Sequence, residues 1–335
     1  MNFRLRLPGL PATVLASALT VLATLITLPA AQAQTANSTG TTRIVVPYPP
    51  GQGADLIMRL MAEPLGKRLG QPVIVDNRPG AGGTIGTEYV SKQPADGSTL
   101  LMGSSGAISI APTLTPQAAR YNPLKDFEPL TGVAAVAQVF VVSAKSPHKD
   151  LAGFLQAARK DPGKLSFASS GNGSTQHLFM AAFAHDAGIR MLHVPYKGAA
   201  PAFNDLMGGQ VDIMSDTTAA ILPQIKAGKV VALGVTSAAR QPQLPEVPTL
   251  AEQGVKNFSA EGWITVLAPP GMAAPLADRL DREMRASLAD PAVARKIREM
   301  GFVEMRESRA ELRKFIAAEL ARWKSVIDAA HITAE

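Results

Sequence analysis

Short runs of β-branched and other apolar residues alternate along the chain with segments whose apolar positions recur every three to four residues. The run Ile44–Val46 is the first of these and predicts a strand, and the periodic segment Asp55–Leu69 after it predicts a helix. The alternation continues to about residue 235. Such a succession is typical of α/β proteins, with open and mainly parallel sheets flanked by helices.

The pattern predicts the following elements. The strands are expected at Ile44–Val46, Val73–Val75, Thr99–Met102, Val133–Val142, Leu165–Ala168, Met191–Val194, Val211–Met214, Val230–Val235 and Gly262–Leu267, with a short one within Phe302–Met305. The helices are expected at Asp55–Leu69, Thr84–Lys92, Leu151–Arg159, Gln176–Ala187, Pro201–Met207, Ala219–Lys226, Pro275–Leu288, Pro291–Met300 and Ser308–Ala330. Pro64 should kink or divide the first helix, and Ser308 with Glu311 forms a capping box for the last one.

Two extended apolar segments, Val133–Val142 and Gly262–Leu267, separate two α/β blocks. They predict a two-lobed molecule with a hinge of two strands. Lobe 1 is expected to contain residues 34–138 and 264–335, and lobe 2 residues 139–263.

A Pro- and Gly-rich corner follows the first strand, at Pro47–Asp55. Gly51 and Gly53 allow close approach of a ligand to the backbone, because they carry no Cβ. Asp55 is expected at or near the N-cap of the helix, where it orders its own loop rather than touching an anion. The free amides of the first helical turn predict a site for a small carboxylate.

A second corner, Ser170–Thr175, repeats this arrangement in the other block, although an ordinary helix N-cap explains it equally well on its own. Ligands on open α/β sheets bind outside the carboxyl ends of the strands, where other polar residues also lie. The candidate ligand-binding residues are Tyr48, Gly51, Gln52, Gly53, Ala54, Asp55, Ser104, Ser105, Ser170, Gly171, Asn172, Gly173, Ser174, Thr175, Tyr196, Lys197, Gly198 and Asp216.

Four of these candidates have specific expected roles, each with a structural alternative. Tyr48 is either an aromatic wall or loop packing. Tyr196 is expected to cover the ligand, and Lys197 either adds positive charge or is a solvated surface lysine. Asp216 either accepts a hydrogen bond from an amino or hydroxyl group of the ligand or caps a helix.

Patterns for other chemistry are missing from the sequence. The third glycine of a dinucleotide-binding motif is replaced by Leu56, and neither a P-loop nor a G-x-S-x-G elbow occurs. There is no Cys, and the five histidines have no dense metal-ligand spacing. His177 and His185 share a predicted helix but lie two turns apart, as packing or surface residues do. Asp212 is expected within a strand and Asp216 beyond its end, which is poor geometry for a carboxylate pair. No catalytic residue, metal or cofactor is expected.

The N-terminus has the features of an export signal. A basic start with Arg4 and Arg6 precedes the uncharged run Leu15–Leu28 and the small-x-small sequence Ala31–Ala33, which predicts cleavage after Ala33. The alternative is an uncleaved membrane anchor. Removal of the two arginines lowers the formal net charge from +6 to +4. The remaining charge is scattered, so no nucleic-acid partner is expected.

In the motifs of several segments the chain resembles the periplasmic solute-binding receptors of tripartite tricarboxylate transporters, also called Bug-type receptors. The matching segments are Val46–Asp55, Val73–Gly83, Asp96–Gly97, Val194–Ala202, Gly208–Asp212, Pro245–Gly254 and Gly262–Trp263. Gln52 departs from the family pattern, in which a second glycine often follows the one matching Gly51.

The resemblance implies a two-lobed α/β fold of the periplasmic-binding-protein, Venus-flytrap kind (type II), and a periplasmic receptor without a catalytic step. Its relatives hold small carboxylated solutes, such as organic acids and acidic amino acids, by backbone groups, hydroxyls and waters from both lobes. The implied partners are such a ligand and the membrane permease subunits of the transporter, and the receptor is expected to be a monomer. Two alternatives are an extracytoplasmic sensor that presents its closed form to a signalling partner and, with less support, an exported α/β hydrolase.

Overall fold

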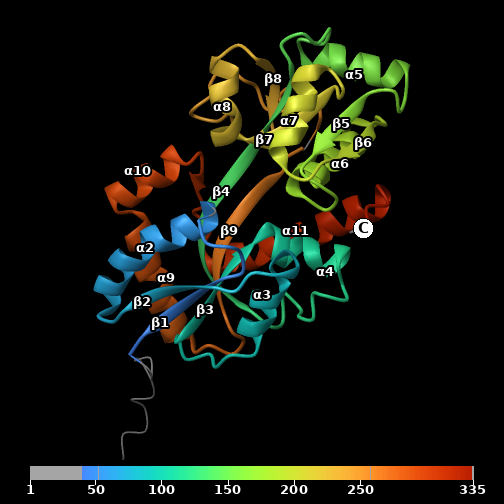
Figure 1. The fold of residues 1–335 in the computed structure, drawn as a ribbon. Coiled ribbons are helices and arrows are strands. Elements are labelled where there is room, and N and C mark those ends of the chain that lie inside the picture. The colour runs from blue at the N-terminus through green and yellow to red at the C-terminus, as the bar shows by residue number, and fades with distance from the viewer. Residues whose placement is uncertain (1–39, 52, 257, 334–335) are drawn as a thin grey trace, which may run out of the picture. The chain divides into compact units, whose positions relative to one another are not determined.

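The fold is described from a computed structural model of the protein, for residues 40–51, 53–256 and 258–333 (Figure 1). The predicted signal segment 1–33, its cleavage site and Gln52 lie outside the described residues. In the described part, no helix is both long and apolar enough to cross a membrane.

Strands and helices alternate through most of the chain. The strands are β1 (Thr42–Val46), β2 (Val73–Asn77), β3 (Thr99–Ser104), β4 (Glu128–Ser143), β5 (Ser166–Ser169), β6 (Leu192–Pro195), β7 (Ile213–Thr217), β8 (Val230–Val235), β9 (Glu261–Ala268) and β10 (Val303–Glu304). The helices are α2 (Gly53–Leu69), η1 (Ala81–Gly83), α3 (Thr84–Ser91), η2 (Ser105–Ile110), α4 (Ala111–Leu114), α5 (Leu151–Lys160), α6 (Thr175–Ala187), α7 (Ala199–Gly208), α8 (Thr218–Lys226), α9 (Ala274–Leu288), α10 (Pro291–Glu299) and α11 (Arg309–Ala329).

The long strand β4 belongs to both halves of the fold (Figure 1). Its first part, Glu128–Ala137, pairs with β9, and its second part pairs with β7 and β8 from residue 138 onward. The path β2-β1-β3-β9-β4 forms the first half, and β4-β7-β5-β6 forms the second. The expectation of mainly parallel sheets holds only for the outer three strands of each half, because all pairings of β4 and β9 are antiparallel.

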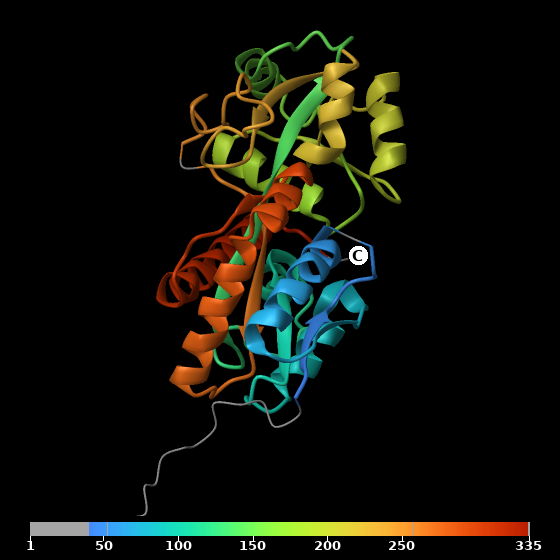
Figure 2. The ribbon, with the colours of Figure 1, turned by 90° about the vertical axis from the view of Figure 1, so that its left-hand side faces the viewer.

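Each half has its own buried core. In the first half, Ile44 and Met102 from the strands pack with Met58 of α2 and Leu280 of α9. Figure 2 shows α9 beside α2. In the second half, Phe140 packs edge-on against Phe183, with ring centroids 5.0 Å apart.

The last turns of α11 contribute to the core of the second half rather than the first. Trp323 stacks on Phe179 of α6, with centroids 5.5 Å apart, and Val326 and Ile327 lie in the same cluster. Lobe 1 was expected to contain all of residues 264–335, whereas this end of α11 packs with residues assigned to lobe 2.

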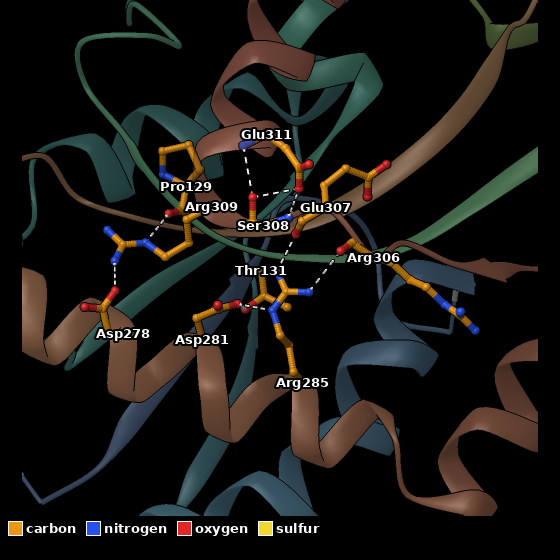
Figure 3. Close-up of polar contacts among 10 residues, drawn as sticks. All are labelled: Pro129, Thr131, Asp278, Asp281, Arg285, Arg306, Glu307, Ser308, Arg309 and Glu311. Atoms are coloured by element: carbon orange, nitrogen blue, oxygen red, sulfur yellow. Dashed lines mark hydrogen bonds and ion pairs between the residues drawn. The ribbon is translucent and has the colours of Figure 1, made fainter.

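A polar network fixes the start of β4 to α9 and α11 (Figure 3). Arg309, the first residue of α11, donates to the Pro129 carbonyl at 3.2 Å and also bonds Asp278 of α9. Asp281 of α9 accepts from the Thr131 hydroxyl at 2.7 Å and from Arg285 at 2.8 Å. This end of β4 is therefore tied to two helices of the first half.

The last helix begins as the sequence predicts. Ser308 accepts from the Glu311 amide, and the Glu311 carboxylate accepts from the Ser308 amide at 2.8 Å, so both bonds of the capping box are present (Figure 3). The C-terminal helix α11 therefore starts at its predicted cap.

Most predicted elements are confirmed, with boundaries that shift by a few residues. The α2 helix begins at Gly53, two residues before Asp55, and Pro64 does not divide it. The short helices η2 and α4 were not predicted. The placement of the acidic pair on β7 was wrong, because Asp212 precedes the strand and Asp216 lies within it.

Candidate functional site

The first candidate loop connects β1 to α2, and the buried carboxylate of Asp55 holds it by hydrogen bonds. Asp55 is 1% exposed and accepts hydrogen bonds from the Gly51 amide at 2.9 Å and from Asn77 Nδ2 at 2.8 Å. Arg59, one turn further along the helix, donates to the same carboxylate at 3.0 Å. These bonds confirm that Asp55 orders its own loop, although it sits in the first helical turn rather than at the N-cap.

The charge state of Asp55 follows from these contacts. Burial alone raises the pKa of a carboxyl group, but the bonds from Arg59, Gly51 and Asn77 outweigh it and hold the pKa of Asp55 below its ordinary value. The carboxylate is therefore charged at neutral pH and its oxygens are occupied by the protein's own donors. A ligand contact by the backbone of this loop and by the first residues of α2, Gly53 and Ala54, stays a prediction.

Tyr48 reaches from this loop to the end of β3. Its hydroxyl bonds the Ser104 hydroxyl at 2.7 Å, and burial raises its pKa. A Cβ placed on Gly83 or Gly106 would come within 3.2 Å of the Tyr48 side chain, so the ring fits between two glycine-containing turns. These contacts favour packing as the role of Tyr48.

Ser104 and Ser105 are buried at the start of η2. Ser104 accepts from the Ala107 amide at 3.3 Å and is the N-cap of this short helix. Ser105 is 4% exposed, and its carbonyl accepts from the Ser109 hydroxyl. The predicted polar corner is thus the beginning of a helix, and both serines are buried in it.

The second candidate loop connects β5 to α6. Gly171 and Gly173 have φ angles of 132° and 72°, which favour glycine. The Gly171 amide donates to the Ser169 hydroxyl at 3.2 Å, and the Gly173 amide donates to Nδ1 of His177 at 3.1 Å. The side chains of Ser169, before the loop, and His177, after it, therefore hold the loop in place. This bracing was not predicted.

The helix start after this loop has an ordinary cap. Ser174 is the N-cap of α6 and accepts from the His177 amide at 3.3 Å. Ser170 donates to Gln176 Oε1 at 2.8 Å, and Thr175 is the first helical residue. The N-cap alternative is confirmed for Ser174, and a ligand role for this loop stays a prediction.

The strand end at β6 lies against the second loop. The Tyr196 amide donates to the Ser169 carbonyl at 3.0 Å, and the Gly198 amide donates to the Ser170 carbonyl at 3.3 Å. The Tyr196 hydroxyl donates to Asp205 of α7 at 2.7 Å, and burial and this carboxylate raise its pKa to about 12. Tyr196 is thereby turned toward α7, while Lys197 is exposed.

Asp216 is not the helix cap considered for it, and its role as a ligand acceptor stays a prediction. It lies inside β7 opposite Val139, and its Oδ1 accepts from the Thr217 amide at 2.7 Å. The cap of α8 is Thr217, which accepts from the Ala220 amide, so Asp216 is not that cap. Burial raises the pKa of Asp216, because a charged carboxylate is poorly solvated there.

Close backbone contacts connect the candidate segments to other elements. A Cβ on Gly53 would lie 3.2 Å from two ring carbons of Phe302, and one on Gly301 would lie 3.1 Å from the Ala219 amide nitrogen. The turn Gly301–Phe302 therefore touches the starts of both α2 and α8. A Cβ on Gly173 would lie 2.9 Å from Leu114 Cδ2, so the second loop lies against α4.

The sequence did not reveal the residues that brace these loops. Asn77, Ser169 and Phe302 have no local pattern that marks them, and their contacts depend on the tertiary fold. His177 was interpreted as a packing or surface residue, and only its bond to Gly173 shows a further role. Within the described part of the chain, no group of three or more His, Cys, Asp or Glu residues is placed to hold a metal ion.

Comparison with known sequences gives matches over most of the chain. The family model described as "Tripartite tricarboxylate transporter family receptor" matches residues 57–332. A protein named "UPF0065 protein in tcbD-tcbE intergenic region", from Pseudomonas sp. (strain P51), is 40% identical over 284 residues, which are 84% of each chain. Protein BugT of Bordetella pertussis is 36% identical over 286 residues, covering 85% of this chain and 87% of BugT.

Solved structures match with similar coverage. The periplasmic binding protein BugD has a TM-score of 0.68 and 34% identity, over 88% of this chain and 98% of BugD. The R. palustris protein Rpa4515, solved with adipate, has a TM-score of 0.71 and 34% identity, over 88% and 98% of the two chains. MatC from Rhodopseudomonas palustris, solved with bound malate, has a TM-score of 0.68 and 30% identity, over 86% and 98%.

Proposed function

Because the chain belongs to the tripartite tricarboxylate transporter receptor family, we propose that it captures a small carboxylate-containing solute between its two lobes and delivers it to the membrane permease of such a transporter. Family members are periplasmic solute-binding receptors. In line with this, we propose that residues 1–33 direct export, that cleavage follows Ala33, and that the mature protein is a periplasmic monomer.

One observation carries the proposal: each half presents a glycine-containing loop at the carboxyl end of a parallel strand, directly before a helix. These are the loops before α2 and α6. In each loop, one backbone amide already donates to a side chain of the protein, Asp55 in the first loop and His177 in the second. The remaining amides at the helix starts favour an anion, and neither loop contains Arg.

The lobes are proposed as residues 34–138 with 264–335 and residues 139–263, with β4 and β9 as the hinge strands and the last turns of α11 packed on the second lobe. This assignment is supported by the pairing of β4, which changes partners between Ala137 and Gln138. A ligand that contacts both lobes would shift an open–closed equilibrium toward the closed form.

The relatives' ligands support the solute class. Adipate and malate are dicarboxylates, and they occur in the structures of Rpa4515 and MatC respectively. We therefore place small organic acids first, and acidic amino acids second, among the solutes for this chain.

We expect no turnover of the ligand. Ser174 serves as a helix cap, and the Nδ1 atom of His177 accepts from a backbone amide rather than from a serine hydroxyl. A hydrolase role predicts turnover in a screen of ester and amide substrates, whereas the receptor role predicts none. A sensor role predicts a signalling partner that recognises the closed form, whereas the transport role predicts recognition by permease subunits.

Thermal-shift screening of the mature protein against mono-, di- and tricarboxylates and amino acids tests the proposed function. A specific ligand at 100 times its dissociation constant should stabilise the protein by about 2.7 kcal/mol. If none of the carboxylates in the panel stabilises the protein, the proposal is overturned.

A pair of matched variants tests the site. Ser174→Ala and Ser308→Ala each remove a helix-cap hydroxyl, at α6 and α11 respectively. Both should lower stability by about 1 kcal/mol. Only Ser174→Ala should weaken carboxylate binding in calorimetry. Ser308 belongs to the polar network at the start of α11 (Figure 3) and to neither candidate loop. Equal affinities in the two variants would contradict the placement of the site.

A further inference from the structure

Three aromatic rings stack in a column next to the second loop. The imidazoles of His177 and His193 are parallel within 12°, with centroids 3.8 Å apart, and His193 stacks on Phe167 at 4.8 Å. The three residues come from α6, β6 and β5, so the column joins the helix that follows the loop to the strand before the loop, β5, and to the strand after that helix, β6.

Both imidazoles hold the loop. Nδ1 of His177 accepts from the Gly173 amide at 3.1 Å, so this nitrogen carries no proton. Nε2 of His193 bonds the Ser169 hydroxyl at 2.6 Å, and that hydroxyl also donates to the Gly171 carbonyl at 3.1 Å. The direction of the bond between Ser169 and His193 depends on the tautomer of His193. The bond from Gly173 to His177 is the one that requires a neutral imidazole.

Solvent protons have access to the pair. Both imidazoles line a cavity of about 370 Å³ that is also lined by His185 and Arg190 and is bounded by Ile332 after α11. The side chain of His185 is 47% exposed, so the cavity opens toward solvent. No carboxylate is among the described residues that line this cavity.

Charged groups on the surrounding elements are engaged elsewhere. Their partners are Asp186 for His185, the Ala187 carbonyl for Arg159, Ser166 for Asp212, Tyr196 for Asp205 and Asp328 for Lys324. His331 is exposed at the end of the chain. Burial, and to a smaller extent His193, lower the pKa of His177 to about 4, and burial lowers the pKa of His193. The pair is thus neutral at neutral pH.

We infer that His177, stacked on His193, is a proton-controlled support of the ligand loop: protonation of His177 detaches the Gly173 amide, loosens residues 170–175 and lowers the affinity for carboxylate ligands in acid. The inference rests on the proposed function, because it takes this loop as part of the ligand site. A proton on Nδ1 of His177 would point at the N–H of Gly173, so their hydrogen bond is lost. If His193 is protonated as well, two imidazolium rings 3.8 Å apart repel each other.

The decisive experiment compares pH profiles of affinity for adipate and malate between pH 7.5 and pH 3.5. His177→Asn places an amide oxygen, which does not titrate, near the position of Nδ1. His185→Asn makes the same change two turns along α6, away from the loop. Protonation of the ligand affects all three proteins alike, so the ratios of their affinities report the protein alone.

Over this range, the wild type should lose about fourfold more affinity than His177→Asn, and His185→Asn should follow the wild type. Parallel profiles of wild type and His177→Asn, or a wild-type affinity that rises in acid relative to His177→Asn, would overturn the inference.

A second readout separates this inference from the proposed function. If the wild type binds neither acid at pH 7.5 nor any other carboxylate, the proposed function fails. The inference is then decided by the amide of Gly173, whose hydrogen-exchange protection factor in the free wild type should fall as pH decreases from 6.5 to 4. A protection factor that stays constant over this range would overturn the inference. This measurement uses the wild type alone, so it remains decisive if His177→Asn does not fold.

Discussion

The loops before α2 and α6 have the same position in their respective halves, yet a charged side chain braces the first and a neutral side chain braces the second. The first is braced by a carboxylate, Asp55, that accepts from the Gly51 amide. The second is braced by an imidazole, His177, that accepts from the Gly173 amide. In both cases an acceptor from the first turn or turns of the helix satisfies an amide of the loop that precedes it.

The difference shows how one structural task can respond to acid in two ways. Asp55 keeps its charge to below its ordinary pKa of 3.8, since its donors stabilise the carboxylate. His177 must lose its proton to serve as an acceptor, and its burial favours the neutral form. As pH falls, the second brace is therefore the first to weaken, near the His177 pKa of about 4, whereas the first persists to lower pH.

The largest expected effect breaks the first brace. Asp55→Ala removes the acceptor for Gly51, Asn77 and Arg59 at a site that is 1% exposed. We expect a loss of about 3 kcal/mol in the free energy of unfolding, measured by urea denaturation. Asp328→Ala, which removes an exposed pair with Lys324, should cost less than about 0.5 kcal/mol. Similar costs for the two variants would show that Asp55 does not brace the loop.

The second prediction concerns the pH dependence of stability and the second brace. The pKa of His177 is about 4 in the folded protein and 6.5 in the unfolded chain, so the unfolded chain takes up the proton first. The contribution of His177 is complete above pH 6.5 and decreases as pH falls to 4, by up to about 3 kcal/mol.

Urea denaturation at several pH values from 7 to 4 measures this slope. His177→Asn should reduce it, because the group that titrates is removed. The stabilising contribution of Asp55 is lost only at lower pH, through its lowered pKa, and does not produce the same slope. An unchanged slope in His177→Asn would contradict the difference between the two braces.

The smallest expected effect sharpens the picture of the second loop. Gly173→Ala adds a Cβ at φ 72° and 2.9 Å from Leu114, whereas Gly188→Ala adds one at φ 63° with nothing within 4 Å. Both changes incur the left-handed backbone penalty of about 1 kcal/mol. Gly173→Ala should cost about 1 kcal/mol more in thermal or urea unfolding, because its Cβ meets Leu114. Equal costs would mean that the loop and α4 are not in firm contact.

The order of strands and helices was predictable because hydrophobic periodicity is local. The run Val133–Val142 was identified as a long strand, and β4 contains all of it. Partner choice is not local, so the antiparallel pairing of β4 and β9 was missed. The helix η2 was missed as well, since its residues Ser105–Ile110 follow a Gly- and Ser-containing corner that is typical of a loop.

The candidate loops were predictable from glycine, serine and the adjacent helix starts, but of their supports only Asp55 was. Asp55 was correctly expected to order its loop, since its spacing from Gly51 is local. The stack of His177 on His193 joins residues 16 positions apart through the packing of α6 on β6, and no spacing pattern marks it. Asp216 was placed beyond its strand, because β7 begins two residues later than its apolar run.

The central claim is that the two loops hold the same carboxylate ligand, and a crystal structure of the mature protein with malate or adipate tests it most directly. The account predicts ligand carboxylate oxygens 2.7–3.2 Å from backbone amides or hydroxyls of both the loop before α2 and the loop before α6. A ligand that contacts only one of these loops, or that binds elsewhere on the molecule, would contradict it.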